Sequence, residues 1–491
     1  MTGQRSAIAI AVGMFLLSAC SLTPVEQRPG MDIPARFAEA DRLASSRLMP
    51  EEDSGRWLPA EPADEQRPSP WWNVFGDPVL VRLEEAALKA NPDVSIAMAR
   101  IKQARALTSG SESARLPEVH AGFGPGRQRT SAAAAGRGDD TPGATQTLWR
   151  AQATVAYEVD IFGRVASGVE AAKADEARQQ ALAHQMLLIV QADVAGTYFS
   201  LRQLEGELRL LKETVILRQD ALALLERKID AGAVASVVVD QAKTELFSAR
   251  AEQLAVARQH ALTCHALAIL LGKSPAAFAL EAKPLEHVAI RLPPGVPSTL
   301  LERRPDIAAA ERAMAAENAR IGVAKAAFFP SLSLTGALGY ESADLGNLTN
   351  WSQRTFLLGP LVGTALSMPI FDGGRRKADH ARARAVYEER VAVYRKTVLQ
   401  AFREVEDALV SLRTLDERVA HQQGARLASS RVALSMKARF DEGDIDYLAV
   451  VDAERTLLRS HQSLIQSEGE RARATVDLVR ALGGGWEASR R

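Results

Sequence analysis

Two long stretches without proline place the strongest constraint on how this 491-residue chain folds. No proline occurs between Pro142 and Pro275, and none follows Pro369. Proline lacks a backbone N–H and clashes with the preceding turn, so helix interiors exclude it. The chain is also rich in alanine, leucine, glutamate and arginine, which favour helix. The sequence therefore predicts two long helical regions.

The first proline-free stretch carries the 3,4 spacing of a coiled-coil seam. It predicts one helix from about Arg164 to Ala231, with a length on the order of 100 Å at about 1.5 Å per residue. Arg218 interrupts the seam, and Gly232 is expected to end the helix as a C-cap. A second helix is then expected to return to Leu271. The seam residues are Leu201, Leu204, Leu208, Leu211, Val215, Leu222, Leu225 and Ile229.

The second proline-free stretch predicts the same hairpin of helices with a more polar seam. Its turn runs from Phe440 to Tyr447, Gly443 is expected to cap the helix before it, and the return helix runs to Leu482. Taken alone, helices of this length are typical of a structural rod or tether. That interpretation does not account for the β-hairpins predicted at the opposite end of each helical pair.

The two helical regions belong to an internal duplication. Asn91-Pro92-Asp93-Val94 corresponds to Arg304-Pro305-Asp306-Ile307, and Gly232 corresponds to Gly443. Each repeat is predicted to run as helix, β-hairpin, long helix, tight turn and long helix. We place the first repeat at residues 76–285 and the second at residues 286–491.

Alternating residues predict the strands of the two hairpins. From Trp149 to Ile161 the odd positions are apolar or aromatic, and most even positions are polar or charged. Further strands are predicted from Ser331 to Tyr340, from about Phe356 to Ile370, and more weakly from Pro117 to about Gly124. This alternation suits a membrane β-barrel, and equally a half-buried soluble sheet. Four strands cannot close a barrel, whose smallest common size is about eight, so a membrane barrel would need several chains.

The N-terminus predicts a cleaved and lipidated leader. Arg5 precedes an apolar run from Ala7 to Leu17, which is shorter than the roughly 20 residues that span a bilayer. Residues 1–19 are therefore expected to be a signal peptide. Leu-Ser-Ala-Cys20 resembles a bacterial lipobox, and the serine after it implies sorting to the outer membrane. The alternative is an ordinary signal with a chance cysteine. Clustered prolines predict an extended arm over residues 20–75.

Composition and motifs exclude several classes of protein. Lys+Arg and Asp+Glu both number 60, which argues against nucleic-acid binding, and two cysteines cannot build a disulfide scaffold. Gly272-Lys273-Ser274 lacks the upstream glycine of a phosphate-binding loop. The sequence contains neither a His-Glu-x-x-His nor a Gly-x-Ser-x-Gly motif. We expect no enzymatic activity, no metal and no cofactor.

Taken in order, the motifs resemble the TolC-like outer-membrane efflux factors, in the lipoprotein branch that serves resistance–nodulation–division pumps. The matching segments are Trp71–Pro78, Leu300–Ile307, Ala327–Leu332, Pro369–Arg375 and Tyr447–Glu454. The resemblance implies an α+β, mostly α, fold and a homotrimer. Three chains of four strands would form one outer-membrane β-barrel, and their long helices a periplasmic α-barrel. The implied partners are outer-membrane lipid, a periplasmic adaptor protein and an inner-membrane pump. The implied function is a passive conduit for drugs and other toxic small molecules.

The resemblance also assigns site residues. Leu448 and Asp452 match the apolar constriction and the carboxylate of the periplasmic gate, and residues i and i+4 share a helix face. The alternative for Leu448 is packing within the coiled coil. Ala449 stands where some relatives carry a second aspartate, which puts a double carboxylate ring in doubt. Gly232 and Gly443 match the turns that meet the adaptor, and Cys20 matches the acylated residue.

Two other functions fit the same sequence. One is a duct of the same architecture that serves another machine, such as type I protein secretion. The other is a coiled-coil lipoprotein that forms no channel and only anchors or spaces. The second predicts neither conductance nor a shared barrel.

Overall fold

The computed structural model describes residues 22–25, 29–31, 37–39, 70–131, 144–230, 234–283, 304–358 and 365–484. Cys20 and Gly232 lie outside these ranges. The contacts divide the chain into two compact units. We call residues 1–29, 101–179 and 310–394 the sheet unit, and residues 30–100, 180–309 and 395–491 the helical unit.

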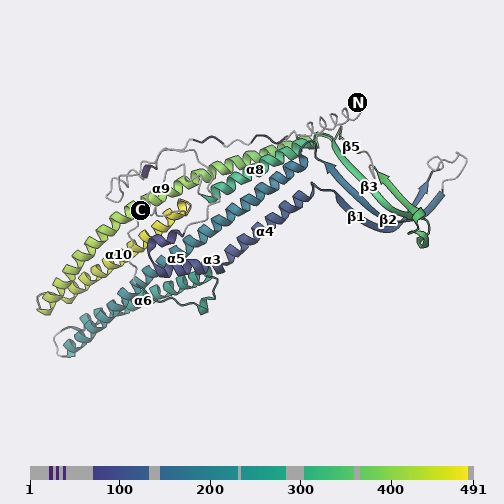
Figure 1. Cartoon of the computed structure of the whole chain (residues 1–491). Helices are drawn as coiled ribbons and strands as arrows, with labels where there is room; N and C mark the ends of the chain where they lie inside the picture. The colour runs from purple at the N-terminus through teal and green to yellow at the C-terminus, as the bar shows by residue number, and fades with distance from the viewer. Residues whose placement is uncertain are drawn as a thin grey trace. The chain divides into compact units, whose positions relative to one another are not determined.

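In both halves of the chain a helix of moderate length is followed by antiparallel strands, a very long helix and a returning helix (Figure 1). The first half contains η1 (Trp71–Phe75), α3 (Pro78–Ala90), α4 (Pro92–Ser113), β1 (Glu118–Thr130), β2 (Ala144–Val159), α5 (Arg164–Asp230), α6 (Ser236–Leu270) and η3 (Pro275–Ala277). The second half contains α8 (Pro305–Ala326), β3 (Ser331–Ser342), η4 (Leu345–Asn347), η5 (Trp351–Gln353), β4 (Arg354–Leu358), β5 (Leu366–Ser367), α9 (Arg375–Asp441) and α10 (Tyr447–Ala481). Helices α4 and α8 have 22 residues each, α5 and α9 have 67, and α6 and α10 have 35. These equal lengths support the predicted duplication.

The two longest helices also begin in the same way. The Asp160 carboxylate accepts hydrogen bonds from the backbone N–H groups of Val165 (3.1 Å) and Ala166 (2.7 Å) at the start of α5. The Asp372 carboxylate accepts one from the backbone N–H of Arg376 (3.2 Å) at the start of α9. The first N–H groups of a helix have no partner within the helix, and carboxylates satisfy them well. The matched aspartates therefore fix where each long helix starts.

The sheet unit contains one antiparallel sheet with the order β1-β2-β3-β4, and β5 pairs with β3 (Figure 1). Leu338 is opposite both Ala153 and Phe356, so the three side chains share one face. The opposite face is polar: Arg150 Nε donates to Glu341 Oε2 at 2.6 Å. The alternation predicted from the sequence is confirmed by this register.

The apolar face of the sheet is exposed within the chain. Phe123, Leu338 and Phe356 are 66%, 67% and 76% exposed. Among the described strands, β1 pairs only with β2 and β4 only with β3, so each leaves one edge without a partner. Exposed apolar surface and unpaired edges both mark a sheet that associates further.

Two predicted strands differ in the structure. The strand expected from about Phe356 to Ile370 is seen as β4 and β5, and residues 359–364 lie outside the described ranges. Residues 368–370 continue no strand, because Pro369 has no N–H for a ladder bond. The weak first strand runs on past Gly124 to Thr130, through a register of pairs with β2.

The helical unit is built around an apolar cluster that joins η1 and α3 to α5, α6, α9 and α10. Trp71 is buried there and donates from Nε1 to Gln191 Oε1 at 3.1 Å. Asp77 caps α3 by accepting from the N–H of Val79 at 2.8 Å, and also accepts from the Tyr198 hydroxyl. The Trp-Trp motif is therefore a packing element of this core. No helix among the described residues is both long and apolar enough to cross a membrane.

Candidate functional site

The turn between α9 and α10 lies at one end of the helical unit (Figure 1). Gly443 lies in this turn, and Leu448 and Asp452 lie in the first turns of α10. Gly443 follows α9 with φ +81°, and its N–H donates to Phe440 O at 3.0 Å. The N–H of Asp444 then donates to Arg439 O at 2.9 Å. This left-handed conformation suits glycine and closes the helix. The counterpart turn at Gly232 lies outside the described residues.

Leu448 and Asp452 lie one turn apart on α10, on the face that the chain leaves exposed. Leu448 is 52% exposed, and the side chain of Asp452 is 64% exposed. The adjacent Val450, Val451 and Ala453 are buried instead. Within the chain, therefore, Leu448 does not fill a coiled-coil seam, and α10 presents an apolar and an acidic side chain side by side.

A chain of charged side chains runs from Asp452 into the interior. Arg455 Nη1 lies 3.6 Å from Asp452 Oδ1, and Arg455 Nε donates to Glu245 Oε1 at 3.0 Å. The buried Arg218 forms an ion pair with Glu245 and donates to its backbone oxygen at 3.0 Å. Asp452 on α10 is thereby connected through α6 to α5.

Glu245 is the centre of this chain. Burial alone would raise the pKa of its carboxyl, but the hydrogen bond from Arg455 and the charge of Arg218 outweigh burial and lower the pKa. The carboxylate is therefore ionised at neutral pH and holds both guanidinium groups. Burial also raises the pKa of Glu454, one residue before Arg455.

The structure explains one sequence feature and adds two residues. Arg218 interrupts the predicted seam because it is the buried partner of Glu245. Glu245 and Arg455 were not predicted. A signal for Glu245 existed, since it occupies a buried position of α6 between Ala242 and Ala249. Arg455 is half-exposed and gives no such signal in the sequence.

Aromatic packing holds the two helical hairpins together near their turns. The rings of Phe440 and Tyr447 lie 5.6 Å apart, and Lys228 Nζ lies 5.0 Å from the centre of the Phe440 ring. Both rings pack against an apolar cluster around Leu225 and Val239. The α9–α10 turn therefore rests on α5 and α6, and supports the start of α10 where Leu448 lies.

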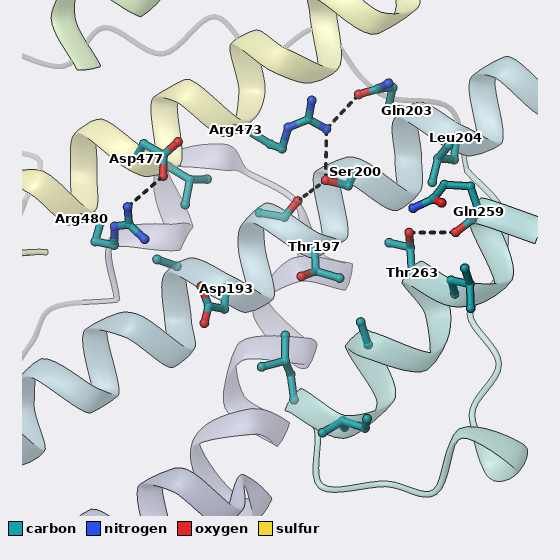
Figure 2. A pocket seen from close by; sticks show the side chains of 17 residues that line it. Asp193, Thr197, Ser200, Gln203, Leu204, Gln259, Thr263, Arg473, Asp477 and Arg480 are labelled. Carbon is teal, nitrogen blue, oxygen red and sulfur yellow. Dashed lines mark hydrogen bonds and ion pairs between the residues drawn. The ribbon is translucent and has the colours of Figure 1, made fainter. Parts of the chain in front are cut away.

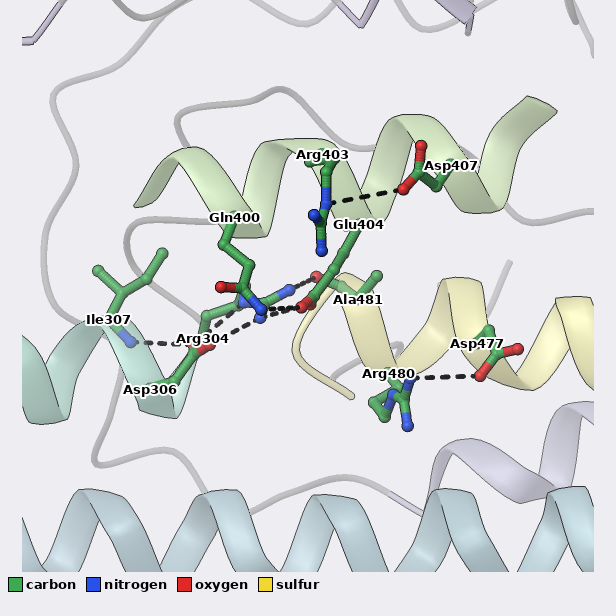
Figure 3. Close-up of polar contacts among 10 residues, drawn as sticks. All are labelled: Arg304, Asp306, Ile307, Gln400, Arg403, Glu404, Asp407, Asp477, Arg480 and Ala481. Atoms are coloured by element: carbon green, nitrogen blue, oxygen red, sulfur yellow. Dashed lines mark hydrogen bonds and ion pairs between the residues drawn. The ribbon is translucent and has the colours of Figure 1, made fainter. Parts of the chain in front are cut away.

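The Arg-Pro-Asp motif lies at the other end of the hairpin and is architectural (Figure 3). Buried Arg304 donates from Nη1 to Ala481 O at 2.9 Å, and from Nη2 to Asp306 at 2.7 Å and to Glu404 at 2.8 Å. It thereby joins the start of α8 to α9 and to the last residue of α10. Burial alone would lower the pKa of Arg304, but its hydrogen bonds and ion pairs with Asp306 and Glu404 together raise it.

A cavity of about 830 Å³ lies between α5, α6 and α10 (Figure 2). Arg473 donates to Ser200 at 3.0 Å and to Gln203 at 2.9 Å, and Arg480 lies 3.5 Å from Asp477. Its lining contains no histidine or cysteine, and its carboxylates are those of Asp193 and Asp477. Across the described residues, no three His, Cys, Asp or Glu side chains are grouped to hold a metal ion.

Comparisons with known proteins match most of the chain. A family model described as outer membrane efflux protein matches residues 83–273 and 296–484, once in each half. Outer membrane protein OprJ of Pseudomonas aeruginosa is 34% identical over 489 residues, which cover 99% of this chain and 96% of OprJ. The toluene efflux pump outer membrane protein TtgF of Pseudomonas putida is 33% identical over 482 residues, covering 98% and 96%. The solved outer-membrane channel OprN has a TM-score of 0.83 at 28% identity, over 95% of this chain and 100% of that one.

Proposed function

The chain belongs to the outer membrane efflux protein family, and we propose that three copies of it form one duct through which drugs and other toxic small molecules leave the cell. As a member of this family it is an outer-membrane channel protein that extends into the periplasm. The trimer, the gate and the partners below are the proposed part.

The observation that carries the proposal is the open sheet with one exposed apolar face. The five strands occupy four positions across the sheet, because β4 and β5 pair with different parts of β3. A sheet with two unpaired edges cannot stand alone in lipid, because each unpaired backbone group there is costly. Three copies joined edge to edge give twelve strands, which is a size that closes into a barrel. Leu338 and Phe356 then face lipid, and the pair formed by Arg150 and Glu341 faces the lumen.

The helices supply the periplasmic part of the proposed duct. Helices α5, α6, α9 and α10 of three copies line one tunnel. Its far end is formed by the turns at Gly232 and Gly443, which are the proposed contacts with a periplasmic adaptor. The adaptor connects the duct to an inner-membrane pump of the resistance–nodulation–division class. That pump supplies the energy, and the duct itself is passive. Acylation of Cys20 anchors the chain in the outer membrane.

The proposed gate is a ring of three Leu448 and three Asp452 side chains. Leucines at a narrow point impede water and ions, and a carboxylate ring attracts cations. The exposure of both side chains on one face of α10 supports this assignment. Arg455 contacts both Asp452 and Glu245, and thereby holds the Asp452 side chain in its place in the ring of three carboxylates.

Single-channel conductance in planar bilayers tests the duct and the gate together. We expect a low or flickering current for the wild type and a larger, steadier current for the double variant Leu448→Ala/Asp452→Ala. Asp444→Ala is the matched control, because its carboxylate lies in the α9–α10 turn that precedes the gate residues and pairs with Arg439 at 2.6 Å. Equal currents in wild type and double variant would contradict the gate. No current from inserted protein would favour a coiled-coil lipoprotein that forms no channel.

The same assay tests the charge of the gate. Ala449→Asp adds a second carboxylate directly after Leu448 in the chain. We expect this substitution to make the current more sensitive to block by divalent cations. Serine at this position adds no charge and is the control. Purification of the duct together with its partners tests the class of pump that it serves. Recovery of a type I secretion exporter, and of no resistance–nodulation–division pump, would contradict the proposed pump partner.

A further inference from the structure

The apolar face of the sheet changes character at its outer end. The helices leave the sheet at the other end, since α5 begins at Arg164, just after Val159 of β2. The chain extends into the periplasm through these helices, so the Trp149 end of β2 is the outer one. Beyond Trp149 the same face continues with two polar side chains, Thr147 and Thr145. Before it, the face is apolar or aromatic throughout: Val159, Tyr157, Val155, Ala153, Ala151 and Trp149.

The length of this apolar run matches the thickness of a membrane. Trp149 is ten residues before Val159 in the chain, a distance of about 34 Å along a strand that rises about 3.4 Å per residue. Strands of membrane barrels tilt by roughly 35–45°, which leaves a height of about 26 Å. The apolar band of such barrels is about 25 Å tall. Thr147 and Thr145 therefore lie in the headgroup layer of the outer leaflet.

Two arginines of β1 lie in the same layer. Arg127 pairs with Thr147 and Arg129 with Thr145, so both share the face of Trp149. Both side chains are exposed, and neither forms an ion pair within the described part of the chain. On the opposite face, by contrast, Arg150 is paired with Glu341. Arginine on a lipid-facing strand is costly at the middle of the bilayer and tolerated at its surface, which agrees with this placement.

The other edge of the sheet carries a third arginine on this face. Arg354 begins β4 and pairs with Tyr340, two residues beyond Leu338 on β3. Its Nε donates to Trp351 O at 2.8 Å, and its guanidinium carbon lies 3.2 Å from the centre of the Trp351 ring. Trp351 is 71% exposed, and aromatic side chains are typical of the membrane surface. The ring therefore holds the guanidinium of Arg354 at the level of the headgroups.

The three arginines come together where two copies of the chain meet. Strands β1 and β4 are the unpaired edges of the sheet. In the proposed trimer, β4 of one copy lies beside β1 of the next, and we call this boundary the seam. Arg354 of one copy and Arg127 and Arg129 of the next then lie on neighbouring strands, on one face and at one end of the sheet.

We propose that these arginines form a phosphate-binding site at each seam, occupied by the headgroup of an outer-leaflet glycolipid of the lipid A class. The inference rests on the proposed trimer and extends it, because one bound lipid bridges two copies and stabilises their contact. Charge complementarity identifies the occupant. Guanidinium groups bind phosphate oxygens through paired, charge-assisted hydrogen bonds. The position of the site at the end of the apolar band then assigns the phosphate to a lipid whose acyl chains lie along that band.

Native mass spectrometry of the purified full-length trimer measures the bound lipid. With diphosphoryl lipid A we expect three molecules per trimer, one for each seam, and a higher temperature for dissociation of the trimer in SDS. Lipid A without its phosphates keeps the acyl chains and should bind at least about tenfold more weakly. Equal binding of the two lipids would overturn the phosphate site. An equal rise in dissociation temperature with inorganic phosphate would assign the arginines to a free anion and overturn the lipid site.

A pair of substitutions tests the residues of β1. Arg127→Gln/Arg129→Gln removes charge-assisted hydrogen bonds and is expected to weaken the binding of diphosphoryl lipid A at least about tenfold. Arg115→Gln/Arg382→Gln is the matched control, because it removes two exposed arginines of the same sheet unit, one just before β1 at its inner end and one on α9. The control should bind the lipid as the wild type does. Equal losses in both variants would mean non-specific attraction by charge and would overturn the site.

Combined substitutions test whether one lipid bridges the seam. If Arg354 contacts the same headgroup as Arg127 and Arg129, the effect of Arg354→Gln depends on those two residues. We expect Arg354→Gln to weaken lipid A binding several-fold in the wild type and much less in the Arg127→Gln/Arg129→Gln background. Equal factors in both backgrounds would show independent contacts and overturn the shared site.

Conductance separates this inference from the proposed function. The three arginines lie on the outside of the barrel, so Arg127→Gln/Arg129→Gln should conduct as the wild type does. Normal conductance together with lipid binding that does not depend on phosphate would overturn the site and leave the duct in place. A wild-type protein that is monomeric in the native mass spectrum would contradict the proposed trimer, and the seam site with it.

Discussion

Asn91 and Arg304 occupy the same place in the two repeats and make the same bond. Asn91 Nδ2 donates to the carbonyl of Leu270 at 2.9 Å, and Arg304 Nη1 donates to the carbonyl of Ala481 at 2.9 Å. Leu270 and Ala481 are the last residues of α6 and α10. In each repeat, the residue just before the 22-residue helix therefore donates a hydrogen bond to the last carbonyl of the 35-residue helix.

Loss of these two side chains is expected to lower the free energy of unfolding by different amounts. Arg304→Ala leaves Asp306 and Glu404 without their buried cation, and we expect a loss of about 3–5 kcal/mol. Asn91→Ala removes a cap and a neutral hydrogen bond, and we expect a loss of about 1–2 kcal/mol. Thermal melting followed by circular dichroism checks the order. Arg403→Ala, in an exposed pair with Asp407, is the control and should have little effect.

Glu84 makes the stability of the helical unit depend on pH. Its side chain is fully buried on α3, neither carboxylate oxygen has a hydrogen-bond partner, and burial raises its pKa to about 9. The folded protein holds the carboxyl protonated, so unfolding releases a proton between the ordinary pKa near 4.5 and about 9. Stability is therefore expected to fall as pH rises through this window.

Glu84→Leu is expected to remove that slope and raise the melting temperature at pH 8, because the apolar side chain has no ionisation cost. Glu85→Leu is the matched control, since Glu85 is exposed on the same helix. Melting temperatures measured from pH 5 to pH 9 check the prediction. Parallel curves for Glu84→Leu and wild type would mean that another group carries the pH dependence.

Glu245→Gln is expected to loosen the start of α10. The substitution leaves Arg218 buried without its carboxylate, at a cost of about 3 kcal/mol, and weakens the hold on Arg455. Hydrogen exchange should rise in residues 240–250 and 447–458. Glu252→Gln is the control, because Glu252 lies on α6 as Glu245 does and its exposed carboxylate accepts a hydrogen bond from Gln462 of α10. It should leave hydrogen exchange unchanged.

The pH dependence at Glu245 has the opposite sign to that at Glu84. The pKa of Glu245 is lowered, so its pairing is fully present above pH 4.5 and is lost as pH falls through the folded-state pKa. Lowering the pH should therefore increase hydrogen exchange at the start of α10 in the wild type. The increase should be smaller in Glu245→Gln than in the wild type. An acid response of equal size in both proteins would assign it to another carboxylate.

Leu338→Arg tests the face of the sheet that is proposed to contact lipid. An arginine near the middle of a lipid-facing strand costs about 2–4 kcal/mol. We expect a lower folded fraction in liposomes, measured by the change in gel mobility on heating. Gln152→Arg, in the opposite face of the neighbouring strand, should insert as the wild type does. Equal loss in both variants would mean that the two faces are not distinguished by the membrane.

Local patterns predicted most of the fold. Proline exclusion and heptads predicted α5 from Arg164 to Asp230 within one residue, and the alternation around Trp149 predicted which residues of β2 share the apolar face. A charged residue interrupts an apolar stripe at Arg218, and another does so at Glu84, which follows Leu80 and Leu83 on the buried face of α3. In both places the periodicity identifies the buried position.

Contacts between distant segments were not predictable in this way. Glu245 and Arg455 are 210 residues apart, and their pairing depends on how α6 and α10 pack. Gly322 lies in an alanine-rich helix, where one more small residue carries no signal. A Cβ at this position would collide with Thr23 and Ser167, whose positions no periodic pattern fixes.

The equal lengths of the two hairpins limit how such a chain can change in size. One residue added to a helix rotates everything beyond it by about 100° and shifts it by about 1.5 Å. Because Phe440 and Tyr447 pack on the apolar cluster of α5 and α6, a longer hairpin in one repeat would pull the two turns out of register. Growth or shrinkage is tolerated only as whole heptads, about 10 Å at a time, introduced into all four long helices together.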